Sequence, residues 1–197
     1  RRKDKADRAT LQQVLDPRTL LILSKMIRRE LISEVNGCIS TGKEANVYYA
    51  VRPPLEPGQP PRSVAIKIYK TSILVFKDRD RYAGLRAPSP VELRDHVLVM
   101  EFLGDDDGWS SPRLKDAEAL IAPEDWTRLY RELVATMRLM YHQCRLVHAD
   151  LSEYNILLHD NHLWLIDVSQ SVEHDHLHAF DFLREDIAHI DAYFSKH

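Results

Sequence analysis

The chain has 197 residues, which suits one domain or two small lobes around a cleft. Its hydrophobic share of 44% is too high for a disordered chain, and it has no run of about 18 apolar residues, so we expect no membrane span. The net charge of −3 hides a basic front part (1–82) and an acidic back part (83–197). The basic part indicates either contacts with nucleic acid or phosphate, or helix faces of mixed charge in solvent.

The first stretch predicts two short helices separated at Asp16-Pro17. Proline suits the first turn of the second helix, and the Asp16 side chain can cap that helix. Apolar residues at helical spacing predict its buried face: Leu20, Leu23, Ile27 and Leu31. Because the chain begins with Arg1 and not with Met, we expect a fragment of a longer protein.

Segments rich in β-branched and aromatic residues follow, and each predicts a strand. They are residues 34–40, 45–52, 63–70 and 96–103. Alternation in the third of them predicts one face made of Val64, Ile66 and Ile68. Lys67 then lies on the opposite face. The Pro- and Gly-rich residues 53–61 predict a surface loop.

The back part turns helical. Pro123-Glu124-Asp125 predicts a helix start with acidic residues in the first turn, and the helix should run to about Cys144. Its predicted apolar stripe consists of Trp126, Leu129, Leu133, Met137 and Met140. A final helix should begin near His178. Helices, then strands, then helices favour an α+β fold with a mainly β lobe and a mainly α lobe.

The stretch "GCISTGKE" (37–44) is one residue short of a Walker A phosphate loop, because Glu44 takes the place of the Ser or Thr that binds Mg²⁺. A Walker loop also leads into a helix, whereas "ANVYYAVR" here predicts a strand. A P-loop is therefore disfavoured. An ordinary hairpin turn and a different kind of phosphate-binding turn both remain open on this stretch alone.

Three later motifs favour the phosphate-binding turn. "VAIK" places Lys67 on a strand, "HADLSEYN" fits the pattern H-x-D-x-x-x-x-N with Asp150 and Asn155, and "LIDVSQ" places Asp167 after an apolar strand. In this order they form the minimal set of groups for phosphoryl transfer in the protein-kinase class.

Each residue type has a physical role in that chemistry. Lys67 supplies a positive charge for the α- and β-phosphates of ATP. Asn155 and Asp167 offer the hard oxygen ligands that Mg²⁺ prefers. Asp150 is the expected catalytic residue, which accepts or orients the proton of a hydroxyl group or a water molecule.

Further residues are predicted to contact ATP. The turn offers backbone N–H groups, hydroxyls and a cation from Ser40, Thr41, Gly42 and Lys43. The order of segments along the chain places "VMEFL" at the interlobe hinge of a kinase. The predicted nucleotide contacts there and on the strand after the turn are Met100, Glu101, Leu103 and Val47.

Through these motifs the chain resembles the RIO family of atypical protein kinases, type-one branch. "STGKEANVYYA", "HADLSEYNIL" and "LIDVSQSVEHDH" carry the resemblance, which extends over nearly the whole chain. It implies a bilobal protein-kinase-like fold, with RIO-specific helices in 1–35, a β-rich lobe in 36–102 and a helical lobe in 103–197. It also implies a serine/threonine kinase and ATPase that uses ATP and Mg²⁺.

The resemblance further implies a role in late cytoplasmic maturation of the small (40S) ribosomal subunit, with pre-40S particles, their pre-rRNA and ribosomal proteins as partners. A phosphorylated Asp167 is part of that expectation, and a carboxylate is a feasible acceptor. Ala149 replaces the Arg of the usual H-R-D motif, and no A-P-E element follows Asp167, so we expect no ordinary peptide-docking platform. An ATP-binding assembly scaffold with little turnover is the alternative. The two cysteines, Cys38 and Cys144, fit reduced thiols in the cytosol or nucleus.

One departure from the kinase pattern concerns Lys67, which needs a Glu partner on a helix. Between Lys70 and the hinge the acidic residues are Asp78, Asp80, Glu92 and Asp95, and none lies in a convincing helix. We therefore predict that a segment is absent between Tyr82 and Ala83. A separate cluster, His174, Asp175, His176 and His178, could in principle bind zinc but is more simply a capping turn.

Overall fold

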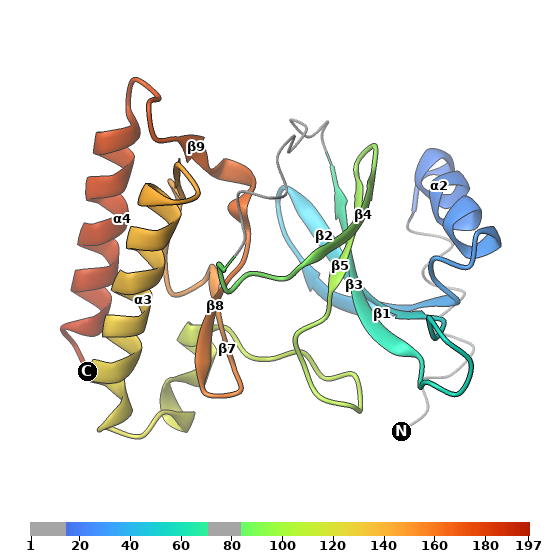
Figure 1. Ribbon diagram of the computed structural model, residues 1–197, viewed down its shortest axis with the longest axis horizontal. Helices are drawn as coiled ribbons and strands as arrows, with labels where there is room; N and C mark the ends of the chain where they lie inside the picture. Colours follow the sequence, from blue (N-terminus) through green and yellow to red (C-terminus); the bar gives the residue numbers. More distant parts are fainter. Residues whose placement is uncertain (1–14, 71–83) are drawn as a thin grey trace. The chain divides into compact units, whose positions relative to one another are not determined.

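The structure is a computed structural model, and it describes residues 15–70 and 84–197 (Figure 1). The described residues form two compact units. The N-terminal unit comprises residues 15–70 and 89–110, and the C-terminal unit comprises residues 84–88 and 111–197. The mixture of helices and antiparallel sheets confirms the predicted α+β class.

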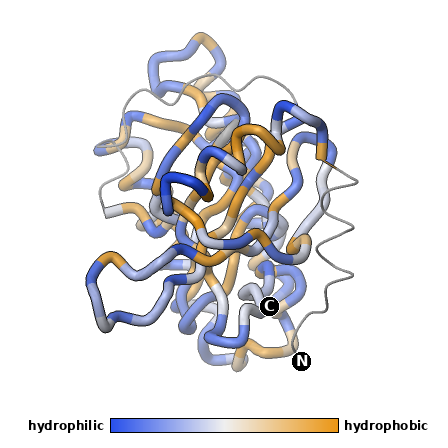
Figure 2. The backbone as a smooth tube through the Cα atoms, turned by 90° about the vertical axis from the view of Figure 1, so that its right-hand side faces the viewer, coloured by the Kyte–Doolittle hydropathy of each residue, from blue (hydrophilic) through white to orange (hydrophobic). Residues whose placement is uncertain are grey.

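The N-terminal unit is built on an antiparallel sheet in the order β1-β2-β3-β5-β4. Its strands are β1 (Glu34–Thr41), β2 (Ala45–Arg52), β3 (Arg62–Tyr69), β4 (Pro90–Arg94) and β5 (Val97–Glu101). All the predicted strands are present, and β4 was not predicted. In Figure 2 the hydrophobic stretches follow the strands, and the hydrophilic ones lie mostly in the loops.

Helix α2 (Pro17–Arg28) covers one face of this sheet (Figure 1). As predicted, Asp16 is its N-cap and accepts hydrogen bonds from the backbone N–H groups of Arg18 and Thr19, both at 3.0 Å. The hydrogen bonds from Thr19 hold the pKa of Asp16 below its usual value. The cap therefore sets where the helix begins.

Of the predicted stripe of α2, only Leu23 is fully buried. The buried residues of the helix are Thr19, Ile22, Leu23 and Met26, whereas Ile27 is 41% exposed and Leu20 and Leu31 are only half-buried. Both stripes have helical spacing, so periodicity could not separate them. Packing against the sheet separates them: Ile22, Leu23 and Met26 belong to one buried cluster with residues of the strands, and the Thr19 hydroxyl on the same face lies 2.6 Å from Nε2 of His96.

The C-terminal unit places two helices side by side, α3 (Asp125–His142) and α4 (Ala179–Phe194) (Figure 1). Ring contacts between Tyr130 and Phe194 and between Tyr141 and Phe180 show that the helices run antiparallel. Smaller elements complete the unit: η2 (Leu114–Leu120), β6 (Leu146–Val147), β7 (Ile156–His159), β8 (His162–Leu165), η3 (Val168–Gln170) and β9 (Val172–Glu173). Of the predicted stripe of α3, only Met137 is not fully buried.

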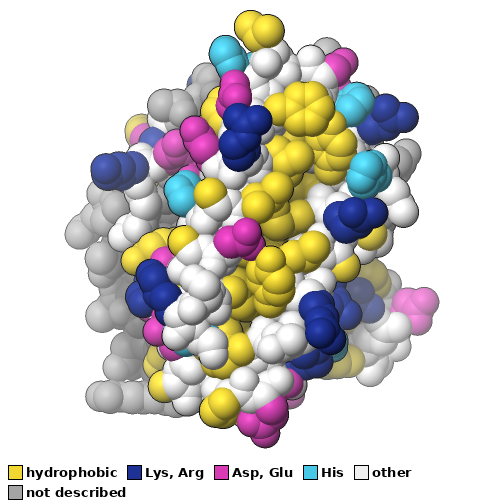
Figure 3. Space-filling model, turned by 90° about the vertical axis from the view of Figure 1, so that its left-hand side faces the viewer, with side chains coloured by type: hydrophobic (Ala, Val, Ile, Leu, Met, Phe, Trp, Pro, Cys, Tyr) yellow, Lys and Arg dark blue, Asp and Glu magenta, His cyan; other side chains and the backbone are white. Residues whose placement is uncertain are grey.

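Figure 3 shows hydrophobic side chains on the surface that it draws. The exposed large hydrophobic side chains of the C-terminal unit include Leu177, Phe180 and Ile187, which are 88%, 67% and 44% exposed. These side chains stay largely in contact with water in the folded unit, so their burial contributes little to the stability of that unit. In the described part of the chain, no helix is long and apolar enough to cross a bilayer.

Two leucines of the C-terminal unit provide a matched test of this core. We expect Leu133→Ala to lower the free energy of unfolding by about 2–5 kcal/mol, because Leu133 is fully buried between its neighbours and would leave a cavity. Leu177→Ala should change it by less than about 0.5 kcal/mol, because the side chain already lies in solvent. Urea titrations followed by circular dichroism measure both, and equal effects would contradict this assignment of the core.

Candidate active site

The loop between β6 and β7 carries the motif "HADLSEYN" and is anchored at its first residue. His148 is buried, and its Nε2 donates to the carbonyl of Ile166 at 3.1 Å. Its Nδ1 accepts the backbone N–H of Asp150 at 3.3 Å, which leaves Nε2 as the protonated ring nitrogen. His148 thus links the start of the loop to the residue that precedes Asp167.

A second anchor was missed from the sequence. Asp186, on α4, is 2% exposed, and its two carboxylate oxygens accept the backbone N–H groups of Ala149 and Leu151, each at 2.9 Å. Burial raises the pKa of Asp186, although these two hydrogen bonds and the nearby His148 oppose the rise. Asp186 shares the buried stripe of α4 with Ala179, Ile190 and other apolar residues, and this inward position becomes visible only once the neighbouring elements are placed.

Within the loop, the side chains of Asp150 and Asn155 are hydrogen-bonded. Nδ2 of Asn155 donates to the backbone carbonyl of Asp150 at 2.7 Å and to Oδ2 of Asp150 at 3.0 Å. Because both amide hydrogens are used, the oxygen of the Asn155 amide is the atom left to accept a hydrogen bond or bind a metal. The predicted catalytic residue and one predicted metal ligand are therefore neighbours.

The antiparallel hairpin of β7 and β8 brings Asp167 to the same place. Ile156 pairs with Leu165, and beyond this pair the N–H of Ile166 donates to the carbonyl of Asn155 at 3.0 Å. Asp167 follows directly, in the left-handed region at φ 59°, as the N-cap of η3. The hairpin thus places Asp167 one residue beyond the hydrogen bond that joins Ile166 to Asn155, next to the segment that carries Asp150.

This donor set fits Mg²⁺. A carboxylate and an amide oxygen on adjacent backbone segments are hard ligands, and Mg²⁺ usually completes its shell with water and phosphate oxygens. The cluster at His174–His178 is different: among residues 15–70 and 84–197 no group of three or more His, Cys, Asp or Glu side chains could hold a metal ion.

The predicted phosphate-binding turn lies in the N-terminal unit, between β1 and β2. Its Gly42 N–H donates to the carbonyl of Ala45 at 2.9 Å, and the Lys70 ammonium donates to the carbonyl of Gly42 at 2.6 Å. Because a strand and not a helix follows, a Walker loop is excluded. Lys70, at the end of β3, is a cation of this turn that the sequence motifs did not single out.

The other predicted ATP-binding residues lie on the central strands of the same unit. Lys67 is buried on β3 opposite Val47 of β2, with its ammonium 5.0 Å from the ring centroid of Tyr69. Met100 and Glu101 end β5, and the Glu101 carboxylate accepts the backbone N–H of Ser89 at 3.1 Å. Leu103, just beyond, is buried.

The structure therefore brings the candidate residues together in two sets. The first set lies in the N-terminal unit: Ser40, Thr41, Gly42, Lys43, Val47, Lys67, Met100, Glu101 and Leu103. The second set, in the C-terminal unit, is Asp150, Asn155 and Asp167. That the two sets converge on one nucleotide stays a prediction.

The predicted absent segment, between Tyr82 and Ala83, lies outside the described residues, as do Asp78 and Asp80. The other two acidic residues before the hinge are described, and neither lies in a helix. Glu92, on β4, pairs with Arg29 at 2.9 Å, and Asp95, in the turn after β4, pairs with Arg18 at 3.9 Å.

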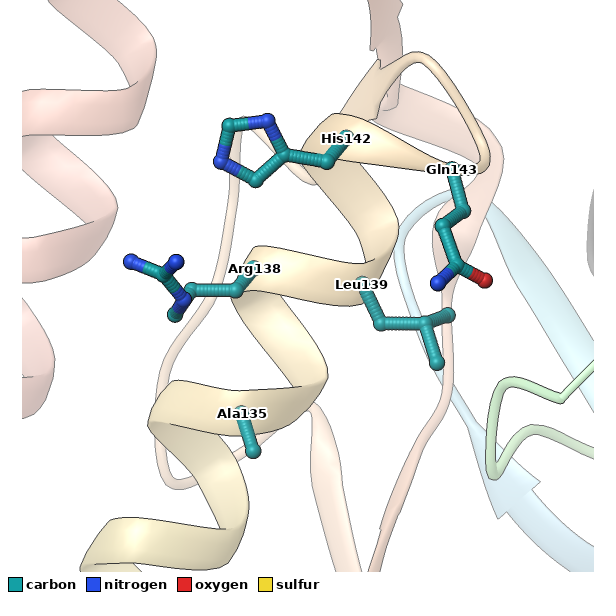
Figure 4. A pocket seen from close by; sticks show the side chains of 5 residues that line it. All are labelled: Ala135, Arg138, Leu139, His142 and Gln143. Carbon is teal, nitrogen blue, oxygen red and sulfur yellow. The ribbon is translucent and has the colours of Figure 1, made fainter.

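Two surface hollows lie beside α3 in the C-terminal unit. The larger, of about 460 Å³, is lined by Ala135, Arg138, Leu139, His142 and Gln143. Figure 4 shows that Arg138 and His142 extend to one side of the helix and Leu139 and Gln143 to the other. The smaller, of about 250 Å³, lies between α3 and residues 84–86. Neither is lined by a predicted site residue.

Comparisons with known proteins agree on one family. The RIO domain family profile matches residues 81–197. The serine/threonine-protein kinase rio1 of Schizosaccharomyces pombe is 49% identical over 230 aligned residues, which cover 98% of this chain and 45% of that protein. The human serine/threonine-protein kinase RIO1 is 48% identical and covers 99% of this chain and 39% of that protein.

Solved structures match as well. The Rio2 kinase from Chaetomium thermophilum, in its ADP/Mg²⁺-phosphoaspartate complex, matches with a TM-score of 0.69 at 20% identity, covering 90% of this chain and 60% of that chain. This likeness confirms the kinase-like RIO fold. The chain therefore belongs to the RIO family, and to its RIO1 branch, since the human RIO3 kinase is only 35% identical.

The chain spans less than half the length of these RIO1 relatives. The alignment with the S. pombe protein is also longer, at 230 positions, than the 197 residues of the chain. That relative therefore has residues without a counterpart here, which is consistent with an absent segment but does not locate it.

The role of Asp186 can be tested directly. We expect Asp186→Ala to lower the free energy of unfolding by about 1–3 kcal/mol for each backbone donor left buried without a partner, here Ala149 and Leu151. The rate of hydrogen exchange at the amides of Ala149 and Leu151 should increase in the same variant. Asp181→Ala, an exposed change on the same helix, is the control. Unchanged exchange at both amides would show that Asp186 does not hold the loop.

Proposed function

We propose that this chain forms the nucleotide-binding and phosphoryl-transfer region of a RIO-type serine/threonine kinase that also hydrolyses ATP. The observation that carries the proposal is the set of hydrogen bonds that joins Asn155 to Asp150 and to Ile166, the residue directly before Asp167. Asn155 donates to Asp150 through its side chain and accepts from Ile166 through its backbone. These are the groups that the protein-kinase reaction requires for the base and the metal.

In the proposed reaction, the bond between the γ-phosphorus of ATP and its bridging oxygen breaks, and a bond to an acceptor oxygen forms. Asp150 accepts or orients the proton of the acceptor, which is a Ser or Thr hydroxyl or a water molecule. Asn155 and Asp167 hold Mg²⁺, which neutralises charge on the phosphates when bound. Lys67 binds the α- and β-phosphates, and the turn at Ser40–Lys43 covers the phosphates.

Asp167 is also the proposed acceptor in a covalent step. Its carboxylate oxygen would attack the γ-phosphorus, with ADP as the leaving group, and water would later hydrolyse the aspartyl phosphate. A precedent for the acceptor type is the Rio2 kinase of Chaetomium thermophilum, which has been solved as a phosphoaspartate complex with ADP and Mg²⁺. Ala149 supports this route, because the site has no H-R-D arginine to order a phosphorylated activation loop.

The biological setting is part of the proposal. We place the protein in the cytoplasm, at the late maturation of the small ribosomal subunit, where pre-40S particles with their pre-rRNA and ribosomal proteins would be its partners. Membership of the RIO1 branch supports this setting.

Single-turnover hydrolysis of ATP tests the enzymatic function. With Mg²⁺ present, we expect Asp150→Ala to slow the reaction by about 100-fold or more, because the base is removed. Asp167→Ala should abolish Mg²⁺-dependent hydrolysis and any hydroxylamine-labile phosphoprotein, because it removes both a metal ligand and the proposed acceptor. Asp181→Ala, on the exposed side of α4, should behave as the wild type.

Equal rates in the wild type and both site variants would reject the enzymatic function. If ATP still bound in that case, the chain would be an assembly scaffold that binds ATP with little turnover.

A further inference from the structure

The positions of the proposed metal ligands depend on a hairpin that is too short to be stable by itself. Strands β7 and β8 have four residues each, and Asn155 and Asp167 flank their open end. A two-stranded hairpin is marginally stable by itself in water. The contacts that hold β8 therefore decide how far Asp167 lies from Asn155.

The outer edge of β8, which faces away from β7, is completed by groups that belong to no strand. The N–H of Leu163 donates to Oε1 of Glu132 on α3 at 2.9 Å. Two residues further on, the N–H of Leu165 donates to the backbone carbonyl of Arg86 at 2.8 Å. A side-chain carboxylate and a loop carbonyl thus take the places that a third strand would occupy.

These two partners are also joined to each other. Nη1 of Arg86 lies 2.5 Å from Oε1 of Glu132, and the Glu132 side chain is largely buried. Its other oxygen contacts Nδ1 of His162 at 2.9 Å and Nη1 of Arg128 at 3.5 Å. Burial alone would raise the pKa of Glu132, but the hydrogen bonds from His162, Leu163 and Arg86 outweigh it and lower the pKa. Glu132 therefore stays charged at neutral pH.

We propose that Arg86 and Glu132 form a positioning pair that completes the edge of β8 and thereby sets the separation of Asn155 and Asp167. The inference rests on the proposed function, in which these two side chains bind Mg²⁺. Arg86 and Glu132 bind neither the metal nor the nucleotide, and they act through the strand.

The path from the pair to the metal ligand is short. Leu165, whose N–H the Arg86 carbonyl accepts, is separated from Asp167 only by Ile166. Ile166 is itself bonded to Asn155 and to His148, so β8 cannot shift without moving these contacts. Outer contacts that orient metal ligands typically change metal affinity 10- to 100-fold when they are removed.

Metal affinity in the presence of a non-hydrolysable ATP analogue tests the inference, with Mn²⁺ as a spectroscopic substitute for Mg²⁺. We expect Glu132→Ala to raise the dissociation constant of Mn²⁺ by about 10-fold or more, as read by electron paramagnetic resonance. Glu132→Gln keeps an acceptor oxygen for Leu163 and should have a smaller effect. Glu185→Ala, an exposed change on α4, should have none.

Hydrogen exchange on the same variants provides a readout that needs no metal. Exchange at Leu163 and Leu165 should rise in Glu132→Ala and remain at the wild-type rate in Glu185→Ala. Faster exchange together with weaker Mn²⁺ binding supports the positioning role. Unchanged exchange, or faster exchange with unchanged Mn²⁺ affinity, overturns it. A wild-type chain that binds no Mn²⁺ with the analogue rejects the proposed function, and exchange at Leu163 and Leu165 then still decides whether Glu132 holds the strand.

Discussion

The buried carboxylate of Asp186 is the interaction on which the candidate catalytic loop depends. A charge inside a protein is costly unless hydrogen bonds compensate for lost water, and here two backbone N–H groups do so. The same two groups, on Ala149 and Leu151, flank Asp150. The arrangement therefore serves both partners: the carboxylate is solvated by the loop, and the loop is held in one conformation by the carboxylate.

That conformation is not one that a free chain would adopt. Ala149 and Asp167 both have positive φ, at 68° and 59°, which costs free energy for residues other than glycine. Such backbone persists only where surrounding contacts over-determine it. His148 meets this need for both residues, because it lies next to Ala149 and bonds to the carbonyl just before Asp167. One strained position, Asp167, is a proposed metal ligand and the other, Ala149, directly precedes the proposed catalytic Asp150, which fits a site organised before its ligands bind.

Local patterns predicted much of this protein. The strands, the cap at Asp16 and the helix α3 follow from alternation, capping and periodicity, which act within a few residues. The motif around Asp150 and Asn155 was equally visible, because the hydrogen bond between their side chains spans only five residues. The buried face of α2 was not predictable in this way, since two periodic stripes are present and only packing against strands far along the chain separates them. That the predicted ATP-binding residues contact a nucleotide stays a prediction.

The same division separates the reactive groups from the groups that hold them. The proposed phosphoryl-transfer reaction restricts which residue types can stand at Asp150, Asn155 and Asp167. These residues can therefore be recognised in a single sequence. Asp186 and Glu132 act by accepting hydrogen bonds from backbone N–H groups, for example that of Leu163. Every residue except proline has such a group, so this role leaves no motif in the donor residues. A carboxylate with such a role looks like any other on an amphipathic helix, except that it occupies the inward side. The feature to look for is thus a carboxylate on the buried face of an amphipathic helix. That face can be identified only once the elements that pack against the helix have been placed.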